Sequence, residues 1–272
     1  MYSKHQNKSM LNRIALSDPR FERDNLRFLT ITSNHIKGRG DVSAFVPPGS
    51  NYQDLPIVLL LHGVYASHWA WTHLAGVHLQ AMNAINNGSL KPMVLVMPSD
   101  GLWGDGSGYI KHKDQNFEEW ITEDVIGGVI QSIKETSDRS SLFVAGLSMG
   151  GFGALRLGAK YGSRIRAVSG LSSMTDARQL RDFSDNDISG ILDENKDELS
   201  VFDTMIKYKN TLPAIRFDCG LSDQLLEPNR ELHSLLLKEN IDHIYKEYPG
   251  SHEWPYWEQH IMESLTFFND FL

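Results

Sequence analysis

The sequence predicts an α/β fold with a mostly parallel central sheet, and two observations support this prediction. Short apolar, β-branched runs alternate with amphipathic stretches of helical length along most of the chain. The runs at Ile57–Leu61 and Met93–Met97 are apolar throughout, as expected of parallel strands covered by helices on both faces. The 272 residues contain no repeat or low-complexity tract, so we expect residues 1–272 to form one domain.

The individual elements follow from local patterns and turn residues. Near the N-terminus, strands are expected at Leu26–Ser33 and Asp41–Val46, joined by a turn at Gly38–Gly40. Apolar runs predict the remaining strands at Ile57–Leu61, Met93–Met97, Leu142–Ala145, Ala167–Leu171, Ala214–Cys219 and His243–Tyr248. Helical spacing of apolar residues predicts helices at His73–Asn86, Phe117–Glu135, Gly151–Tyr161, Pro228–Glu239 and Trp257–Phe271.

The alternation of strands and helices is interrupted at residues 174–210, which are polar and rich in charge. Because this stretch follows the end of a strand, we expect an insertion over one end of the sheet. Two interpretations stay open: a solvated helical excursion, or a lid or wall of a substrate site. The spacing of Asp and Asn in it does not match a calcium-binding loop.

The pentapeptide Gly-Leu-Ser-Met-Gly at residues 146–150 is the most informative motif. It follows the apolar run Ser141–Ala145 and precedes a predicted helix. A Gly-x-Ser-x-Gly between a strand and a helix is typical of the nucleophile elbow of α/β-hydrolases. Side chains two positions before and after the serine would clash in so tight a turn, and Gly146 and Gly150 remove them. The pattern therefore predicts Ser148 as a covalent nucleophile.

A serine nucleophile needs a base and an acid that orients the base, and in α/β-hydrolases the chain order is Ser, acid, His. Asp223 lies in a loop directly after a predicted strand, whereas Asp218 lies inside that strand and is not expected to reach its end. Asp223 could alternatively cap the following helix. His252 lies between the last strand and the last helix, which predicts it as the base.

The developing oxyanion of an acyl-transfer reaction also needs hydrogen-bond donors. We expect one from the backbone N–H of Met149, directly after the nucleophile, and another from Val64, in the loop after the strand Ile57–Leu61. Gly63 is expected to let the chain turn sharply enough to aim the Val64 N–H. The neighbouring His62 is interpreted as a brace of this loop rather than a catalytic group.

Aromatic residues follow several predicted strands, at the edge that carries Ser148. Tyr65, Trp69, Trp103 and Trp254 are the candidates for substrate binding. Their rings could stack on a sugar or aryl group or line an apolar acyl pocket, and the alternative is that they brace loops. The glycine-rich stretch at residues 101–108 lacks the Lys-Ser/Thr ending of a phosphate loop, so we interpret it as a rim of the site.

With these motifs in place, the chain resembles the putative esterase (esterase D-like) family of α/β-hydrolases. That family includes S-formylglutathione hydrolases, feruloyl and acetylxylan esterases, tributyrin-type esterases and mycolyltransferases. The resemblance implies an α/β-hydrolase fold, a triad of Ser148, Asp223 and His252, and oxyanion donors at Val64 and Met149. The matching pieces run in family order from about residue 25 to the C-terminus: Leu59–Gly63, Val96–Gly101, Ala145–Gly151, Cys219–Asp223 and Gly250–His252.

The substrate expectation depends on the branch of this family. The loop that begins at His62 lacks the threonine and cysteine of the S-formylglutathione hydrolase branch and is closer to the tributyrin and carbohydrate-esterase branches. We therefore expect a cofactor-independent serine carboxylesterase for short-chain acyl or carbohydrate and aryl esters. An acyltransferase with the same triad, an S-formylglutathione-type thioesterase and a non-catalytic binding protein are the alternatives.

The composition and net charge limit the classes of binding partner that we expect. The formal net charge is −8 and no run of Lys and Arg forms a basic stripe, so no nucleic-acid partner is expected. No apolar run approaches the roughly 20 residues of a membrane span, and the N-terminus lacks a signal-peptide pattern, so we expect a cytoplasmic protein. Cys219 is the only cysteine and is expected to be buried in a strand. We expect a small-molecule ester as partner and no metal, and a homo-oligomer is compatible with the sequence.

Overall fold

The computed structural model describes residues 13–49 and 51–272, and within these its nine strands form one sheet in the order β1-β2-β3-β5-β4-β6-β7-β8-β9. From β1 to β5 the neighbours pair antiparallel, and from β5 to β9 they pair parallel. The mostly parallel sheet expected from the sequence is thereby confirmed. The strands are β1 (Ile14–Leu16), β2 (Leu26–Ser33), β3 (Gly38–Phe45), β4 (Ile57–Leu61), β5 (Val94–Pro98), β6 (Leu142–Leu147), β7 (Ile165–Leu171), β8 (Ala214–Gly220) and β9 (Ile244–Tyr248).

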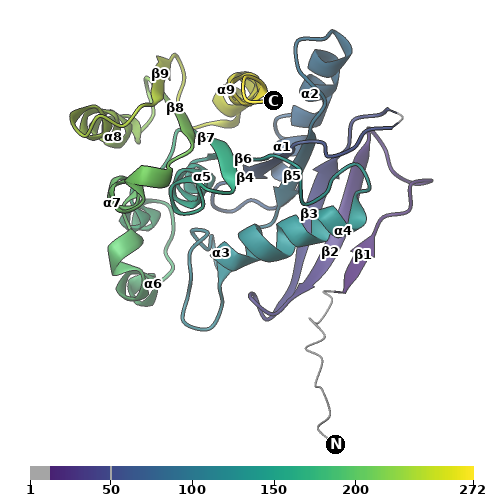
Figure 1. The fold of residues 1–272 in the computed structure, drawn as a ribbon. Coiled ribbons are helices and arrows are strands. Elements are labelled where there is room, and N and C mark those ends of the chain that lie inside the picture. The colour runs from purple at the N-terminus through teal and green to yellow at the C-terminus, as the bar shows by residue number, and fades with distance from the viewer. Residues whose placement is uncertain (1–12, 50) are drawn as a thin grey trace, which may run out of the picture.

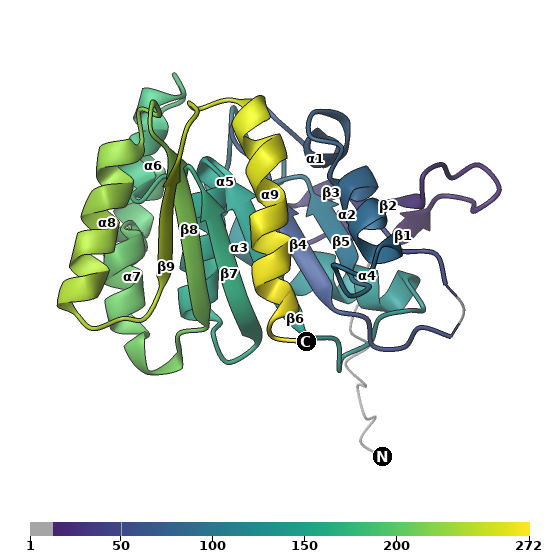
Figure 2. The same cartoon turned by 90° about the horizontal axis from the view of Figure 1, so that it is seen from above.

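Helices cover both faces of the sheet, so its apolar strands lie between two hydrophobic layers (Figure 1; Figure 2). One face packs against α1 (Ala70–His73), α2 (Val77–Asn86) and α9 (Trp254–Asn269). The other face packs against residues 174–210 and against α3 (Phe117–Glu119), the π-helical turn η1 (Trp120–Val125), α4 (Ile126–Ser132), α5 (Met149–Lys160) and α8 (Leu226–Lys238).

The turn between β2 and β3 lies earlier than the sequence predicted. It spans residues 34–37, where the Ser33 hydroxyl accepts the N–H groups of His35 and Ile36 at 3.0 and 3.2 Å. The predicted turn at Gly38–Gly40 is wrong, because these residues belong to β3. Gly40 is required for another reason: a Cβ there would lie 2.3 Å from the Trp120 ring.

Two of the helices expected from the sequence are interrupted or shortened in the structure. The helix expected at His73–Asn86 is divided between α1 and α2, because Gly76 adopts a left-handed conformation with φ 57°. The helix expected at Phe117–Glu135 ends at Ser132, and Ile133 is extended. Its middle turn, η1, is π-helical. The other predicted boundaries differ by a few residues, as is usual at the ends of elements.

Residues 174–210 contribute to the core rather than forming a solvated excursion. They contain η2 (Ala177–Asp182), α6 (Ser189–Glu194), η3 (Lys196–Glu198) and α7 (Val201–Lys207), and η4 (Lys209–Thr211) begins at their end. Their apolar residues are buried in the same core as α3, η1, α4 and α5. These are Met174, Ala177, Leu180, Ile188, Ile191, Leu199, Val201 and Met205.

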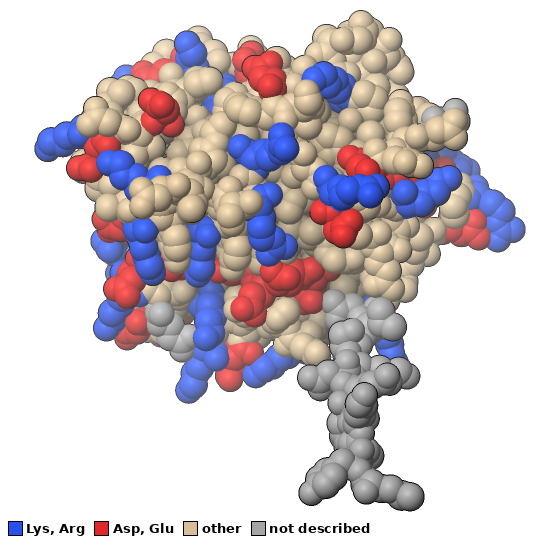
Figure 3. All heavy atoms as spheres, viewed as in Figure 1, with Lys and Arg blue, Asp and Glu red and all other residues tan. Residues whose placement is uncertain are grey.

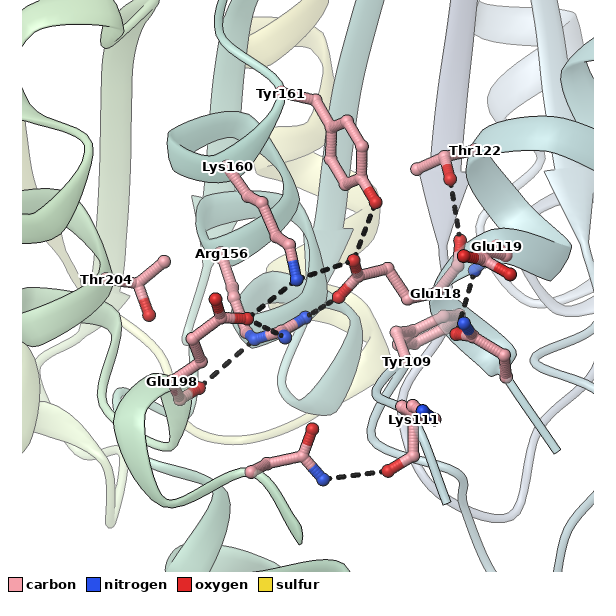
Figure 4. A network of polar contacts seen from close by, with 12 residues as sticks. Tyr109, Lys111, Glu118, Glu119, Thr122, Arg156, Lys160, Tyr161, Glu198 and Thr204 are labelled. Atoms are coloured by element: carbon pink, nitrogen blue, oxygen red, sulfur yellow. Dashed lines mark hydrogen bonds and ion pairs between the residues drawn. The ribbon is translucent and has the colours of Figure 1, made fainter. Parts of the chain in front are cut away.

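A network of ion pairs joins this insertion to α5 (Figure 4). Arg156 of α5 is 1% exposed and donates to Glu118 Oε2 at 2.5 Å and to Glu198 Oε2 at 2.7 Å. Lys160 contacts the same two carboxylates at 2.9 and 2.8 Å, and the Tyr161 hydroxyl donates to Glu118 at 2.7 Å. Each buried charge therefore has an opposite partner, which offsets the cost of removing it from water.

The surface in Figure 3 carries Lys and Arg interspersed with Asp and Glu. Cys219 is buried in β8, as expected. Over residues 13–49 and 51–272, no helix is long and apolar enough to cross a membrane. In the same part of the chain, no three His, Cys, Asp or Glu residues are gathered in a way that could hold a metal ion.

Candidate active site

The topology brings the predicted site residues to one edge of the sheet. The parallel strands β4, β6, β8 and β9 all end at this edge. Val64 follows β4, Ser148 follows β6, Asp223 follows β8 and His252 follows β9. Segments separated by up to 188 positions, from Val64 to His252, therefore meet without any strand having to bend.

Ser148 occupies the sharp turn between β6 and α5. Its backbone has φ 54° and ψ −118°, a conformation that L-residues rarely adopt. A Cβ on Gly146 would lie 2.2 Å from the Gly150 carbonyl oxygen, and a Cβ on Gly150 would lie 2.4 Å from that of Leu61. Both glycines are therefore required by close approach of backbone, as the sequence predicted.

The side chains of Ser148, His252 and Asp223 form a hydrogen-bonded chain. His252 Nε2 lies 3.0 Å from Ser148 Oγ, and His252 Nδ1 lies 2.9 and 3.1 Å from the two oxygens of Asp223. Asp223 also accepts the Leu225 N–H at 2.8 Å, so the predicted contact with the imidazole and a local backbone contact coexist. Burial raises the pKa of Asp223, but the hydrogen bond and charge of His252, together with other hydrogen bonds that include the Leu225 N–H, outweigh it and hold the pKa below its usual value.

The competing carboxylate, Asp218, lies elsewhere. It is fully buried inside β8, where it pairs with Arg216 and accepts the Tyr256 hydroxyl at 2.7 Å. Its neighbours occupy both of its oxygens, and its place inside the strand keeps it from the edge where Ser148 lies. The structure thus brings Asp223, and not Asp218, to His252.

Both residues predicted as oxyanion donors lie near Ser148. Met149 is the first residue of α5, so its N–H has no partner within the helix. Val64 lines the same cavity as Ser148. The left-handed residue in its loop is Tyr65, with φ 61°, and not Gly63. Gly63 instead allows close approach, because a Cβ there would lie 2.8 Å from Leu147 Cδ1.

His62 braces this loop, as the sequence indicated. Its Nδ1 donates to the Gly63 carbonyl at 2.7 Å, and its Nε2 accepts the Asp100 N–H at 3.0 Å. The Asp100 carboxylate in turn accepts the Ser107 N–H at 2.6 Å, which ties down the glycine-rich loop at residues 101–108. Gly108 donates to the sulfur of Met149 at 3.4 Å, so this loop lies directly against the residue that follows the nucleophile.

A cavity of about 490 Å³ opens beside Ser148 and has a mostly apolar lining. Three of the aromatic residues predicted to bind substrate, Tyr65, Trp69 and Trp254, line it. Trp103 does not: its ring packs edge-on against His112 with the ring centroids 4.5 Å apart. The sequence interpretation missed four large apolar lining residues, Leu74, Leu147, Phe183 and Trp257.

Phe183 is the most informative of the residues that were missed. It lies in the insertion, and its ring stacks on that of His252 with the centroids 5.3 Å apart. The available signal was a single large aromatic residue within the polar run Asp182–Asp187. A large apolar side chain in such a run is expected to be covered by something, but the sequence does not say by what.

Comparison with known proteins assigns the family. The model of the putative esterase family matches residues 33–268, which is most of the chain. The chain belongs to the putative esterase family. This esterase is also similar to an acetyl esterase from Caldicellulosiruptor saccharolyticus, with 26% identity over 231 residues that cover 78% of this chain and 83% of the relative.

Solved structures agree with the assignment. A ferulic acid esterase matches with a TM-score of 0.79 and 21% identity over 96% of this chain and 99% of its own. The S-formylglutathione hydrolase FrmB from Staphylococcus aureus matches with a TM-score of 0.76 and 21% identity over 94% and 98%. The fluorophosphonate-binding serine hydrolase FphF from the same species matches with a TM-score of 0.78 and 23% identity over 89% and 97%.

These matches share the α/β-hydrolase fold, which is therefore the fold of this esterase. Together with the family, they make it a carboxylic ester hydrolase. The TM-scores of the ferulic acid esterase and of FrmB are close, so backbone likeness does not separate the two branches considered from the sequence.

Proposed function

We propose that this protein is a serine carboxylesterase that hydrolyses short-chain acyl or compact carbohydrate and aryl esters through an acyl-enzyme on Ser148. One observation carries the proposal: His252 Nε2 lies 3.0 Å from Ser148 Oγ while Asp223 holds its Nδ1. This is the arrangement in which an imidazole can take the serine proton and remain oriented while it is charged.

In the proposed acylation, Ser148 Oγ attacks the ester carbonyl carbon as its proton passes to His252 Nε2. The negative charge that develops on the carbonyl oxygen accepts hydrogen bonds from the N–H groups of Val64 and Met149. When the tetrahedral intermediate collapses, the C–O bond to the alcohol breaks and the alcohol takes the proton from His252. Water then attacks the acyl-enzyme by the same sequence and releases the acid.

The cavity supports the proposed substrate class. Its volume of about 490 Å³ and its aromatic lining suit a short or compact neutral group. The Glu253 carboxylate at its rim would repel the carboxylates of a glutathione thioester, which disfavours the thioesterase alternative. Similarity to an acetyl esterase agrees with a short acyl group. Acyl transfer to an alcohol would use the same residues and is tested by adding sugar acceptors and looking for a new ester.

Replacement of Ser148 by Ala tests the nucleophile. We expect S148A to lower kcat for p-nitrophenyl acetate by at least about a thousandfold, because no covalent intermediate can form. Thermal unfolding should be little changed, since within residues 13–49 and 51–272 the missing hydroxyl hydrogen-bonds only with His252. A fluorophosphonate probe should label the wild type and not the variant. Retained activity or labelling of S148A would refute the proposed role.

A substrate panel tests the size of the pocket. We expect kcat/KM for p-nitrophenyl esters to be highest between acetate and butyrate and to fall toward decanoate, because a longer chain would have to leave the cavity. Methyl ferulate and acetylated xylan should be assayed beside them to compare aryl and carbohydrate esters. A decanoate preference would contradict the short-acyl assignment without contradicting the role of Ser148.

A further inference from the structure

The imidazole of His252 is enclosed by aromatic rings as well as by its hydrogen-bond partners. The Phe183 ring stacks on it, with 29° between the planes and 5.3 Å between the centroids. The Trp257 ring stands perpendicular to it at 5.0 Å. The bonds to Ser148 and Asp223 act through two nitrogens in the ring plane, so they leave the ring free to tilt about the line that joins those atoms. A ring packed on its face opposes that tilt.

Phe183 is held in place by contacts with two loops of the site. Its backbone carbonyl accepts a hydrogen bond from the Tyr65 hydroxyl. The next residue, Ser184, donates its hydroxyl to the Asp105 carboxylate at 2.9 Å, and the Asp105 carbonyl accepts the Tyr65 N–H at 2.8 Å. We call these four residues, Tyr65, Asp105, Phe183 and Ser184, the clasp. They connect the insertion, the glycine-rich loop and the loop after β4.

The clasp also connects the two halves of the catalytic arrangement. Tyr65 directly follows Val64, the proposed oxyanion donor, and Phe183 covers His252, the proposed base. On the basis of the proposed function, we propose that Phe183 is a positioning residue for His252. The clasp then fixes the position of Phe183 relative to the loop after β4, which carries Val64. The insertion thereby contributes to the chemistry of the site and not only to its wall.

The expected effect follows from the role of His252 in both half-reactions. The imidazole gains a proton during acylation and again during deacylation, and each time the resulting cation lies against the Phe183 ring. An aromatic face stabilises such a cation and keeps it aligned. Loss of the ring should therefore slow both steps, whereas loss of a contact with the leaving alcohol would slow acylation alone.

The test measures burst kinetics of p-nitrophenyl acetate with wild type, F183A, F183Y and F202A. Phe202 is the matched control, because it lies in the same insertion, on α7, and is partly buried against the same core without lining the cavity. We expect F183A to lower the acylation and deacylation rates by about tenfold each. F183Y, which keeps the aromatic face, should stay within about threefold of wild type, and F202A should match wild type in both rates.

A second variant tests the clasp separately. Y65F keeps the ring that lines the cavity and removes only the hydroxyl that holds the Phe183 carbonyl. We expect it to slow both half-reactions in the same ratio as F183A but by a smaller factor, with an unchanged melting temperature. Unchanged rates in Y65F would show that the clasp does not position Phe183.

Three outcomes of the F183A experiment would overturn the proposal. A rise in KM alone, or a loss confined to acylation, would make Phe183 a substrate contact. Equal losses of rate in F183A and F202A would make the effect one of general packing. A burst in S148A, or wild-type hydrolysis that persists after fluorophosphonate labelling, would instead refute the proposed function, so the two failures are distinguishable.

Discussion

Asp223 decides which nitrogen of His252 carries the proton. Both of its oxygens lie within 3.1 Å of Nδ1, and the lowered pKa of this carboxyl keeps it ionised, so it can only accept. The imidazole must then donate through Nδ1, which leaves Nε2 free to accept the proton of Ser148. The proposed transfer of the Ser148 proton to His252 depends on this tautomer.

Replacement of Asp223 by Asn should reverse the tautomer. The amide can donate to Nδ1, which places the imidazole proton on Nε2, where it faces the serine. We expect D223N to lower kcat for p-nitrophenyl acetate by about 10⁴-fold, in line with the same change in other serine triads. The melting temperature should change by only a few degrees. A loss of less than tenfold would show that Asp223 does not orient His252.

At the scale of single residues, the sequence predicted which candidate side chains would meet. Ser148, Asp223 and His252 were placed together from their order in the chain and from their positions after strands, and folding preserves both properties. Trp103 was expected in the site on the same grounds but packs on His112 instead. A loop residue can turn its side chain to either side, and neighbours distant in sequence decide which side it takes.

At the scale of elements, the nucleophile elbow shows how a local backbone geometry restricts which residues a position can hold. Between β6 and α5 the chain reverses so tightly that a Cβ on Gly146 or Gly150 would meet a backbone carbonyl, and Ser148 lies at the centre of the turn. Such constraints are local, so a five-residue motif is enough to predict the element. The division of α1 from α2 at Gly76 had no comparable motif, because an isolated glycine is also tolerated inside a helix.

A pair of glycine substitutions measures the constraint at the elbow. In G146A the new Cβ would lie 2.2 Å from the backbone of Gly150, which cannot move away without distorting the turn. We expect a loss of about 2–4 kcal/mol in the free energy of unfolding and loss of activity. Gly127, which is exposed on α4 with nothing near its Cβ position, is the control.

In G127A the free energy of unfolding should rise by up to about 1 kcal/mol, since alanine is the better helix former. Calorimetry of both variants beside wild type gives the comparison. A neutral G146A would show that the elbow can relax, and the requirement for glycine would then have to be abandoned.

At the scale of the whole molecule, the insertion is fastened to α5, the helix that begins beside Ser148. Glu198 is the insertion's main contribution to the ion-pair network in Figure 4. Burial would raise its pKa, but hydrogen bonds from Lys160 and Lys207 and the charge of Arg156 lower it to about 2. The attachment of the insertion to α5 thus depends on a charge that acid can remove.

The sign of the pH dependence follows from this lowered pKa. Above its ordinary value of 4.5, Glu198 is ionised in both states and contributes its full stabilisation, which is lost as the pH falls from about 4.5 to about 2. We expect E198Q to melt well below wild type at pH 7 and the difference to shrink across that window. E239Q is the control, because Glu239 pairs with Lys209 on the surface and should change little.

Scanning calorimetry of the three proteins between pH 7 and pH 3 measures this effect. A difference between wild type and E198Q that stays constant with pH would mean that the Glu198 charge does not fasten the insertion. An E239Q variant as unstable as E198Q would mean that any loss of negative charge has the same effect, wherever it lies.

The sequence by itself determined most of the succession of strands and helices, the candidate catalytic residues and the edge of the sheet where they meet. These depend on periodicity, turn chemistry and chain order, which are local or one-dimensional properties. Only the tertiary structure decided what surrounds Ser148. Phe183 over His252, Trp257 beside it, and Trp103 turned away are contacts between segments distant in sequence, and packing selects them with no repeating pattern that a sequence could display.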